Sequence, residues 1–343
     1  MIDKTKIEAL KTLLATPKQV TVVSHVNPDG DAIGSGLAWS TVLEALGHEV
    51  RFYVPNPYPA FLDWMAGIDK VHIYKVDPER ADDYIAQSEV VFCMDFNQIA
   101  RLEELGEAIE KNTKATRVLI DHHLDPPDDY DLMFSDTTCS STALLTYIII
   151  EKLGLEDKVT YPVAEALYVG ICTDTGNFSF GYLTPELFRI VARLVEKGVD
   201  PPKLNIAIYD NYTADRMRLM GYMLDTKMEV IPEFRAACMS LDKNEQKRYH
   251  FQPGDSEGFV NLPLSIKTVS LSAFFLETRE CIKVSLRSQG DIDVNALARK
   301  YFNGGGHKNA SGGKFFGSME KAVETFHQAL KSEYKPCSSY LKK

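Results

Sequence analysis

The chain has 343 residues, of which 45% are hydrophobic and 25% charged, and its formal net charge is −10 at pH 7. This composition is that of a globular protein with room for two domains, and it excludes collagen-like and disordered classes. The negative charge argues against a protein that slides along long duplex nucleic acid, because such binding needs many Lys or Arg contacts to phosphates. An anionic ligand would need a local group of cations.

Neither a membrane span nor a secretion signal is predicted. Apolar runs are too short to cross a bilayer, and the N-terminal stretch MIDKTKIEALKTLLATPKQ has the pattern of a charged amphipathic helix. The six cysteines are scattered without a CxxC pair. We therefore expect a cytoplasmic protein with reduced cysteines and no membrane partner.

Residues 20–35, VTVVSHVNPDGDAIGS, predict a strand, an acidic loop and the start of a helix. A β-branched run ends at His25, and a Pro-Asp-Gly turn then presents Asp29 and Asp31 before an apolar-periodic segment begins. One imidazole and two carboxylates beyond the end of a strand suit a divalent cation. From this stretch alone, an exposed Asp-Gly turn with an incidental histidine is the alternative.

The next part of the chain alternates strands with helices. A helix over residues 32–46 is followed by the strands HEVRFYVP, VHIY, EVVFCMD and ATRVLIDHH, with a helix over residues 99–111 before the last of them. This order predicts an α/β domain with a mostly parallel sheet and helices on both faces, whose ligands bind beyond the carboxyl ends of the strands. The residues expected at that edge are His25, Asp29, Asp31, Asp95, Asp121, His122 and His123.

Three helices are predicted beyond these strands. SSTALLTYIIIEKLG begins with serine caps and ends in glycine, so its apolar stripe is assigned to the core. YPVAEALYVGICTDTG is mostly apolar until Asp174, for which a ligand role and a helix cap are both open. TPELFRIVARLVEKGVD follows. We expect a first domain over residues 1–190 and a helical connector over residues 191–226.

From about Lys227 the pattern changes to the strands KMEVI, EFRAACMSL, TVSLSAFFLET and CIKVSLRS, and it closes with an amphipathic helix over residues 318–331. These features predict a smaller α+β domain over residues 227–343. Its stretch NGGGHKNASGG is interpreted as a loop whose glycines let backbone N–H groups approach an anion, with His307 as a further donor. Arg287 offers a bidentate contact to phosphate. A surface turn and an ion pair with a surface carboxylate are the respective alternatives.

Four separate strand or helix ends of the first domain thus supply carboxylates or histidines. They provide enough ligands for two cations, and Asp95 in the middle of the sheet is well placed to bridge them. Two cations a few ångströms apart are a recurrent solution for phosphoryl transfer to water, because they lower the pKa of a bridging water and neutralise the attacking and leaving oxygens. The sequence contains no GxSxG elbow and no Walker A loop as an alternative source of chemistry.

The chain resembles the DHH phosphoesterase family with its DHHA1 substrate-binding domain. HVNPDGDAIGS, VVFCMDFN, LIDHH and YVGICTDTG stand in the order of the family's motifs, and SLRS followed by NGGGHKNASGG resembles the DHHA1 pattern. The departures are mild: Asn303 stands where a fourth glycine is often seen, and Asn309 and Ser311 replace alanines.

This resemblance implies two Mn²⁺ ions, for which Mg²⁺ or Co²⁺ can substitute. One ion would be bound by His25, Asp29 and Asp95, and the other by Asp31, Asp95, His122 and Asp174. The implied catalytic residues are Asp31, Asp95, Asp121 and His123, with His123 on the scissile phosphate and Asp121 supporting the histidines. The implied substrate-binding residues are His123, Arg287, Ser288, Gly304, Gly305, Gly306 and His307.

Within the family, the chain looks most like the bacterial nanoRNase type. That type trims RNAs of a few nucleotides from an end and removes the 3′-phosphate of phosphoadenosine phosphate. Cyclic di-adenylate or its linear product is an alternative substrate, and a non-catalytic nucleotide-binding regulator is an alternative function. The expected partners are short RNA oligonucleotides or mononucleotide bisphosphates, and a homodimer is an open oligomeric state.

Overall fold

A computed structural model of the chain describes residues 2–125, 128–210 and 212–337. The chain divides into two compact units, Met1–Asn211 and Tyr212–Lys343. The division falls inside the segment 191–226, so that the helices α7 (Pro185–Glu196) and α8 (Pro201–Tyr209) belong to the first unit and α9 (Ala214–Tyr222) to the second.

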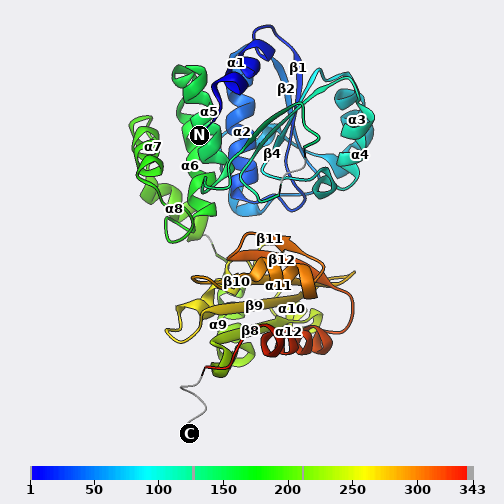
Figure 1. Cartoon of the computed structure of the whole chain (residues 1–343), viewed down its shortest axis with the longest axis vertical. Helices are drawn as coiled ribbons and strands as arrows, with labels where there is room; N and C mark the ends of the chain where they lie inside the picture. The colour runs from blue at the N-terminus through cyan, green and yellow to red at the C-terminus, as the bar shows by residue number, and fades with distance from the viewer. Residues whose placement is uncertain (1, 126–127, 211, 338–343) are drawn as a thin grey trace. The chain divides into compact units, whose positions relative to one another are not determined.

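The N-terminal unit is built on a six-stranded, all-parallel sheet with the strand order β3-β2-β1-β4-β5-β6 (Figure 1). Its strands are β1 (Gln19–Val23), β2 (Glu49–Val54), β3 (Val71–Ile73), β4 (Val90–Met94), β5 (Thr116–Asp121) and β6 (Leu132–Ser135). The order reverses between β1 and β4, which is where open parallel sheets bind their ligands. The segments that follow these two strands therefore begin side by side.

Helices cover both faces of this sheet, as the sequence predicts (Figure 1). α1 (Lys4–Leu13), α2 (Gly30–Ala45), α5 (Thr142–Leu153) and α6 (Tyr161–Asp174) pack on one face, and α3 (Pro78–Gln87) and α4 (Glu104–Lys111) on the other. α2 is buried along most of its length. Such a helix is apolar all round, because it is enclosed on every side.

Local backbone geometry moves two of the predicted helix bounds. α2 begins at Gly30, earlier than the predicted residue 32, because the Asp29 side chain caps its first turn. The helix predicted over residues 99–111 is interrupted: a 3₁₀ turn over Ile99–Leu102 precedes α4, and Glu103 between them has φ +53°. The edge strand β6 was not predicted, since it has only 4 residues.

The C-terminal unit has a mixed six-stranded sheet in the order β11-β12-β10-β9-β8-β7, in which only β8 and β9 pair in parallel among the described strands. Its strands are β7 (Glu229–Ile231), β8 (Ala236–Leu241), β9 (Leu271–Glu277), β10 (Ile282–Ser288), β11 (Gly305–Gly306) and β12 (Ala310–Phe315). α11 (Val294–Tyr301) and α12 (Met319–Glu333) pack on one face, and α9 with the segment Phe259–Ser265 on the other. α10 (Lys243–Arg248) is short. The predicted fold class, α/β followed by α+β, is confirmed.

One prediction in this unit is wrong. The pattern NGGGHKNASGG predicts a loop, but the stretch contains β11 and most of β12. Glycine is a poor strand former, which is why the pattern indicates a loop. Here it is required by packing, because a Cβ on Gly313 would lie 2.3 Å from the carbonyl oxygen of Phe302, at the end of α11.

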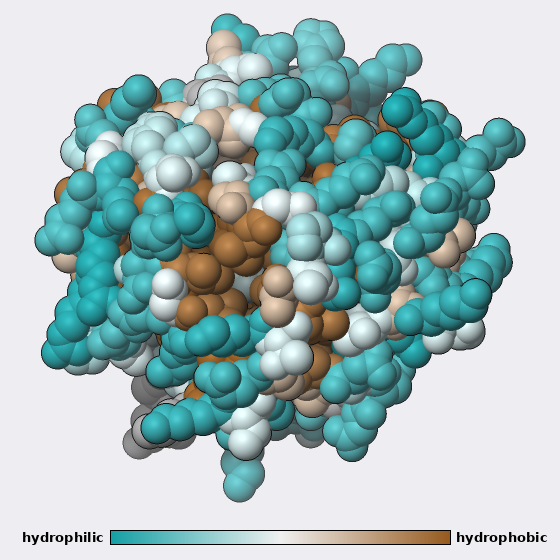
Figure 2. Space-filling model, turned by 90° about the horizontal axis from the view of Figure 1, so that it is seen from above, coloured by the Kyte–Doolittle hydropathy of each residue, from teal (hydrophilic) through white to brown (hydrophobic). Residues whose placement is uncertain are grey.

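The hydropathy of the surface is consistent with a chain rich in charged residues. In the face shown in Figure 2, hydrophilic residues surround a smaller apolar area. Among the described residues, none of the helices combines the length and apolarity that a membrane span requires.

Candidate metal centre

The loop after β1 sets its acidic side chains through the start of α2. The Asp29 carboxylate accepts hydrogen bonds from the backbone N–H groups of Asp31 and Ala32, at 3.0 and 3.1 Å, and so fixes the first turn of the helix. His25 lies just beyond β1, with Nδ1 2.9 Å from the carbonyl oxygen of Val26. Donation from Nδ1 leaves Nε2 as the nitrogen that faces the Asp95 carboxylate, 3.5 Å away.

Asp95 follows β4 at the reversal point of the sheet. Its φ is +64°, in the left-handed region that a non-glycine residue rarely adopts, and its N–H donates to the carbonyl of Ile120 on β5. Strain of this kind is characteristic of functional positions. The carboxylate lies between two histidines, 3.5 Å from His25 and 3.6 Å from His122, and accepts a 2.9 Å hydrogen bond from the Thr142 hydroxyl. It is therefore shared by both halves of the polar cluster.

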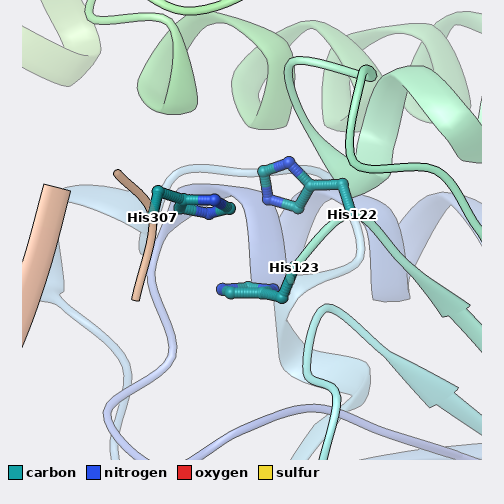
Figure 3. Close-up of side chains that lie close together, drawn as sticks. All are labelled: His122, His123 and His307. Carbon is teal, nitrogen blue, oxygen red and sulfur yellow. The ribbon is translucent and has the colours of Figure 1, made fainter. Parts of the chain in front are cut away.

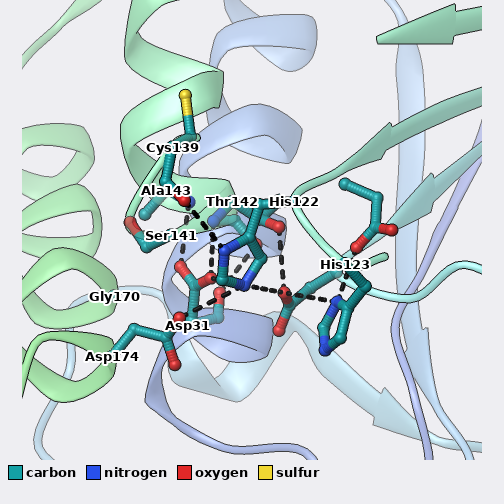
Figure 4. A network of polar contacts seen from close by, with 12 residues as sticks. Asp31, His122, His123, Cys139, Ser141, Thr142, Ala143, Gly170 and Asp174 are labelled. Carbon is teal, nitrogen blue, oxygen red and sulfur yellow. Dashed lines mark hydrogen bonds and ion pairs between the residues drawn. The ribbon is translucent and has the colours of Figure 1, made fainter. Parts of the chain in front are cut away.

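Asp31 is held at the N-terminus of α5, as Figure 4 shows. Its two carboxylate oxygens accept from the backbone N–H groups of Thr142 and Ala143, at 2.6 and 2.8 Å. These are the helix donors that have no partner within the helix, and they favour a negative charge. Gly170 on α6 makes room, because a Cβ there would lie 2.7 Å from an Asp31 oxygen and 2.6 Å from the Ala143 side chain.

His122 is oriented in the same way as His25. Its Nδ1 lies 3.2 Å from the carbonyl oxygen of Cys139, which leaves Nε2 toward the carboxylates. Nε2 is 3.2 Å from Asp174, 3.6 Å from Asp95 and 3.9 Å from Asp31. Asp174, the last residue of α6, thus joins a residue of α2 and residues that follow three strands in one cluster (Figure 4).

His123 has a different set of partners. Its ring stands edge-on to that of His122, with centroids 4.9 Å apart (Figure 3). Its Nδ1 is 2.7 Å from an oxygen of the fully buried Asp121, and its Nε2 is 3.3 Å from Arg101. Asp121 therefore sets the orientation of His123, as carboxylates do for catalytic imidazoles.

Burial and mutual repulsion shift the pKa values of the carboxylates and histidines in this cluster. Burial raises the pKa of Asp31 well above its ordinary value, and the charges of Asp95 and Asp174 raise it further. Burial also opposes ionisation of Asp95, but the hydrogen bond with His25 and the histidine charges outweigh it, so the pKa of Asp95 is lowered. In His25 and His122 burial disfavours the proton, yet the adjacent carboxylates raise the pKa of both imidazoles. The cluster therefore demands compensating positive charge.

The donor set fits two divalent cations. The ligand atoms of His25, Asp29 and Asp95 lie within 4.8 Å of one another, and so do those of Asp31, His122 and Asp174. Carboxylate oxygens with a minority of imidazole nitrogens suit Mn²⁺ or Mg²⁺ better than soft metals. Asp95 borders both groups, and bound cations would remove the repulsion between its charge and that of Asp31.

Comparison with known proteins identifies the family. Residues 19–171 match the DHH family, N-terminal domain, and residues 243–335 match the DHHA1 domain. The bifunctional oligoribonuclease and PAP phosphatase NrnA of Thermus thermophilus is 31% identical over 324 residues, which cover 94% of this chain and 92% of that protein. The chain belongs to the DHH family.

Further relatives support this membership over the whole chain. The Bacillus subtilis protein of the same name is 27% identical over 313 residues, 91% of this chain and 93% of that one. The crystal structure of an exopolyphosphatase-related protein from Bacteroides fragilis superposes with a TM-score of 0.92 at 40% identity, covering 97% of both chains. As a member of the DHH family, the present chain is a metal-dependent phosphoester hydrolase, so the predicted enzyme class is confirmed.

The predicted substrate-binding residues other than His123 lie in the DHHA1 unit. Arg287 near the end of β10 donates from Nη1 to the carbonyl of Leu286 at 3.0 Å. The Ser288 hydroxyl donates to the carbonyl of Ile292 and accepts from the Asn309 amide, so its hydrogen bonds stabilise the loop after β10. His307 follows β11, and its backbone N–H and that of Ala310 each bond to the other's carbonyl.

Local packing also requires glycine at the positions that precede His307. The N–H of Gly304 donates to Ala298 at 3.2 Å, and a Cβ on Gly304 would lie 1.9 Å from the carbonyl oxygen of Gly312. Gly305 and Gly306 pair with β12, and Gly306 has φ +144°. A role of Gly304–Gly306 in binding phosphate stays a prediction.

Sequence reasoning missed three contributors in this DHH-family centre. Thr142 bonds Asp95, Gly170 admits Asp31, and Arg101 contacts His123. The serine caps of α5 indicated a helix N-terminus in the right part of the chain, but nothing in the sequence indicated that a distant carboxylate would bind there. Arg101 carries no local signal, because its role depends on the fold of the turn after β4.

Proposed function

We propose that the protein uses two Mn²⁺ ions to hydrolyse phosphoester bonds in short nucleotides, namely RNAs of 2–5 nucleotides and 3′-phosphoadenosine 5′-phosphate. The observation that carries the proposal is the position of Asp95, a buried carboxylate 3.5 Å from His25 and 3.6 Å from His122. His25, Asp29 and Asp95 would hold one ion, and Asp31, Asp95, His122 and Asp174 the other. When bound, the ions supply Lewis acidity and charge neutralisation for phosphoryl transfer to water.

The protein's own part is preorganisation. The N-terminus of α5 holds Asp31 in place, the Thr142 hydroxyl holds Asp95, and carbonyl groups hold Nδ1 of His25 and His122. Ligands fixed in this way need no rearrangement during the reaction. Asp121 aligns His123, which we assign to the scissile phosphate, and the adjacent Arg101 adds a positive charge beside it.

Short substrates are favoured by charge. The chain has a net charge of −10, and long strands are bound through many Lys or Arg contacts. A dinucleotide needs few such contacts, and Arg287 and His307 are our candidates for its second phosphate. The relatives named oligoribonuclease and PAP phosphatase, at 31% and 27% identity, support the same substrate class.

The test is a turnover panel with the full chain freed of metal and then given Mn²⁺. Diribonucleotide, phosphoadenosine phosphate, cyclic di-adenylate, pyrophosphate and an RNA of about twenty nucleotides are compared by kcat/KM. We expect the first two to be hydrolysed best and chelation to abolish turnover.

Other results would redirect the proposal. A preference for cyclic di-adenylate or its linear product would assign the protein to cyclic dinucleotide degradation. Binding of these nucleotides without turnover of any phosphoester would indicate a regulator. Equal kcat/KM for the long RNA would refute the size selection, since it would require a continuous basic track.

A further inference from the structure

A second group of metal-ligand side chains lies in the C-terminal unit and shares no residue with the centre described above. Glu229 on β7 and Cys238 on β8 are directly opposite in the antiparallel pairing, so their side chains share one face of the sheet. His327 on α12 approaches the same face. The Cys238 Sγ, a Glu229 oxygen and a His327 ring nitrogen all lie within 4.8 Å of one another.

The distances match the edges of a metal tetrahedron. The Cys238 sulfur is 3.7 Å from Oε2 of Glu229, and Nε2 of His327 is 3.3 Å from the same oxygen. Zinc bonds of about 2.3 Å to sulfur and about 2.0–2.1 Å to nitrogen and oxygen, at tetrahedral angles, separate sulfur from oxygen by about 3.5 Å and nitrogen from oxygen by about 3.3 Å. Two of the three ligand-to-ligand distances thus match a tetrahedral zinc site, and the third, between the sulfur and a His327 nitrogen, lies within 4.8 Å.

We propose that Glu229, Cys238 and His327 bind a Zn²⁺ ion, with water as the fourth ligand. A thiolate, an imidazole and a carboxylate select a borderline-soft transition metal, whereas Mn²⁺ and Mg²⁺ prefer the oxygen-rich set of the N-terminal unit. The site has a solvent side, because the side chains of Glu229 and His327 are 53% and 28% exposed, while Cys238 is 3% exposed. The cation can therefore enter past Glu229 and seat on the sulfur.

Binding converts the thiol to a thiolate and passes its proton to solvent. Burial raises the pKa of Cys238 to about 12, and the Glu229 carboxylate contributes, so the thiol is neutral before the cation arrives. Coordination itself removes that proton, as it does in other zinc–cysteine sites.

The bound ion would fasten the edge of the sheet. β7 is the last strand in the order, and its pairing with β8 covers only residues 229–231. A cation joining β7, β8 and α12 would cross-link this short edge strand to the helix that packs above it. The ordinary alternative is an ion pair between Glu229 and His327 over a core cysteine.

Co²⁺ distinguishes these readings, because a cobalt–thiolate bond gives a sulfur-to-cobalt charge-transfer absorption. None of the N-terminal ligand groups among the described residues contains a cysteine, so cobalt bound there does not produce this band. We expect the metal-free full chain to develop the band at one equivalent, and Zn²⁺ to displace it. Cys281→Ser, at a half-buried cysteine outside the group, is the matched control that keeps the band.

Two kinds of variant make the test decisive. Cys238→Ser should abolish the band, and His327→Ala and Glu229→Gln, which alter more exposed side chains, should each weaken cobalt affinity by roughly 100-fold or more, since even outer-shell partners are worth 10–100-fold. Mn²⁺-dependent hydrolysis should be unchanged in His327→Ala. Absence of the band at saturating Co²⁺, or its persistence in Cys238→Ser, would overturn the proposal in favour of the ion pair. Because the cobalt band is read without any turnover, a failure to observe the proposed hydrolysis would not affect the zinc-site proposal.

Discussion

The carboxyl edge of the N-terminal sheet and the 286–313 region of the C-terminal unit both carry residues that the sequence marks as functional, but they are built differently. At the N-terminal edge, Asp31 and Asp95 are buried and each carboxylate is held by Thr142. In the C-terminal region, Arg287 and His307 are half-buried, and the neighbouring Ser288 bonds its own loop. Rigid burial suits groups that must hold charge in one geometry, whereas half-buried hydrogen-bond donors suit recognition of a ligand that binds and dissociates.

The largest effect should come from Asp95→Ala. Losing the carboxylate that borders both ligand groups should remove both ions and lower kcat by about 10³-fold or more. Turnover and metal content measured together test this. Asp83→Ala on α3, at an exposed carboxylate, is the control and should keep both. Near-normal turnover by metal-free Asp95→Ala would contradict the two-metal assignment.

A smaller and different effect is expected in the C-terminal unit. Arg287→Ala should raise KM by roughly ten- to a hundredfold, because a charge-assisted hydrogen bond is worth about 1.5–3 kcal/mol. The metal content of Arg287→Ala should stay normal, whereas Asp174→Ala should weaken the binding of one ion and lower kcat. Steady-state kinetics beside metal analysis separates the two, with Arg279→Ala, at an exposed arginine, as control. Loss of manganese in Arg287→Ala would contradict the assignment of metal binding to the N-terminal unit and substrate recognition to the C-terminal unit.

Thr142→Val tests whether the supports of the N-terminal centre matter as much as its ligands. Removing the 2.9 Å hydroxyl contact to Asp95 should lower kcat or manganese affinity by about tenfold, since a hydrogen bond to a charged group is lost while packing is kept. Thr146→Val on the same helix is a matched control, because its buried hydroxyl has no hydrogen-bond partner within the described residues. Equal behaviour of the two variants would deny Thr142 a positioning role.

The smallest expected effect is a pH-dependent increase in Tm when the metal-free protein binds Mn²⁺. Burial with neighbouring carboxylates raises the pKa of Asp31, and carboxylate partners raise those of His25 and His122 despite burial. The folded metal-free protein thus keeps protons that the unfolded chain releases. The contribution of the two histidines is full below their ordinary pKa of 6.5 and declines as pH rises through their raised values, whereas that of Asp31 begins to decline above its ordinary pKa of 3.8. Asp95, whose pKa is lowered, is ionised throughout this range and does not alter the sign.

Bound cations replace those protons, so the difference in Tm between manganese-loaded and metal-free protein should widen from about pH 6 to about pH 8. Each kcal/mol of added stabilisation corresponds to about 2–4 °C for a domain of this size. Thermal unfolding at several pH values, with and without Mn²⁺, measures it. A difference that stays constant or narrows with pH would contradict this electrostatic account.

The sequence by itself determined the kinds of elements in the N-terminal unit and which of its side chains are candidate ligands. Alternation of strands and helices fixes a parallel sheet, and a parallel sheet brings the ends of its strands to one edge. His25, Asp95 and His122 come together for that reason, without any knowledge of packing. The sequence leaves the role of Asp174 open between a ligand and a helix cap, and the residue joins the others because α6 ends beside His122.

Only the tertiary structure decided what supports these ligands and how glycine is used. Thr142 and the N-terminus of α5 reach carboxylates that are 47 and 111 residues away in the chain, and no local pattern encodes such a pairing. The run at 303–313 has the composition of a loop yet contains β11 and most of β12, and glycine is required at 304 and 313 because a side chain there would collide with neighbouring backbone. Local propensity reports what a segment prefers alone, and close packing between distant segments overrides it.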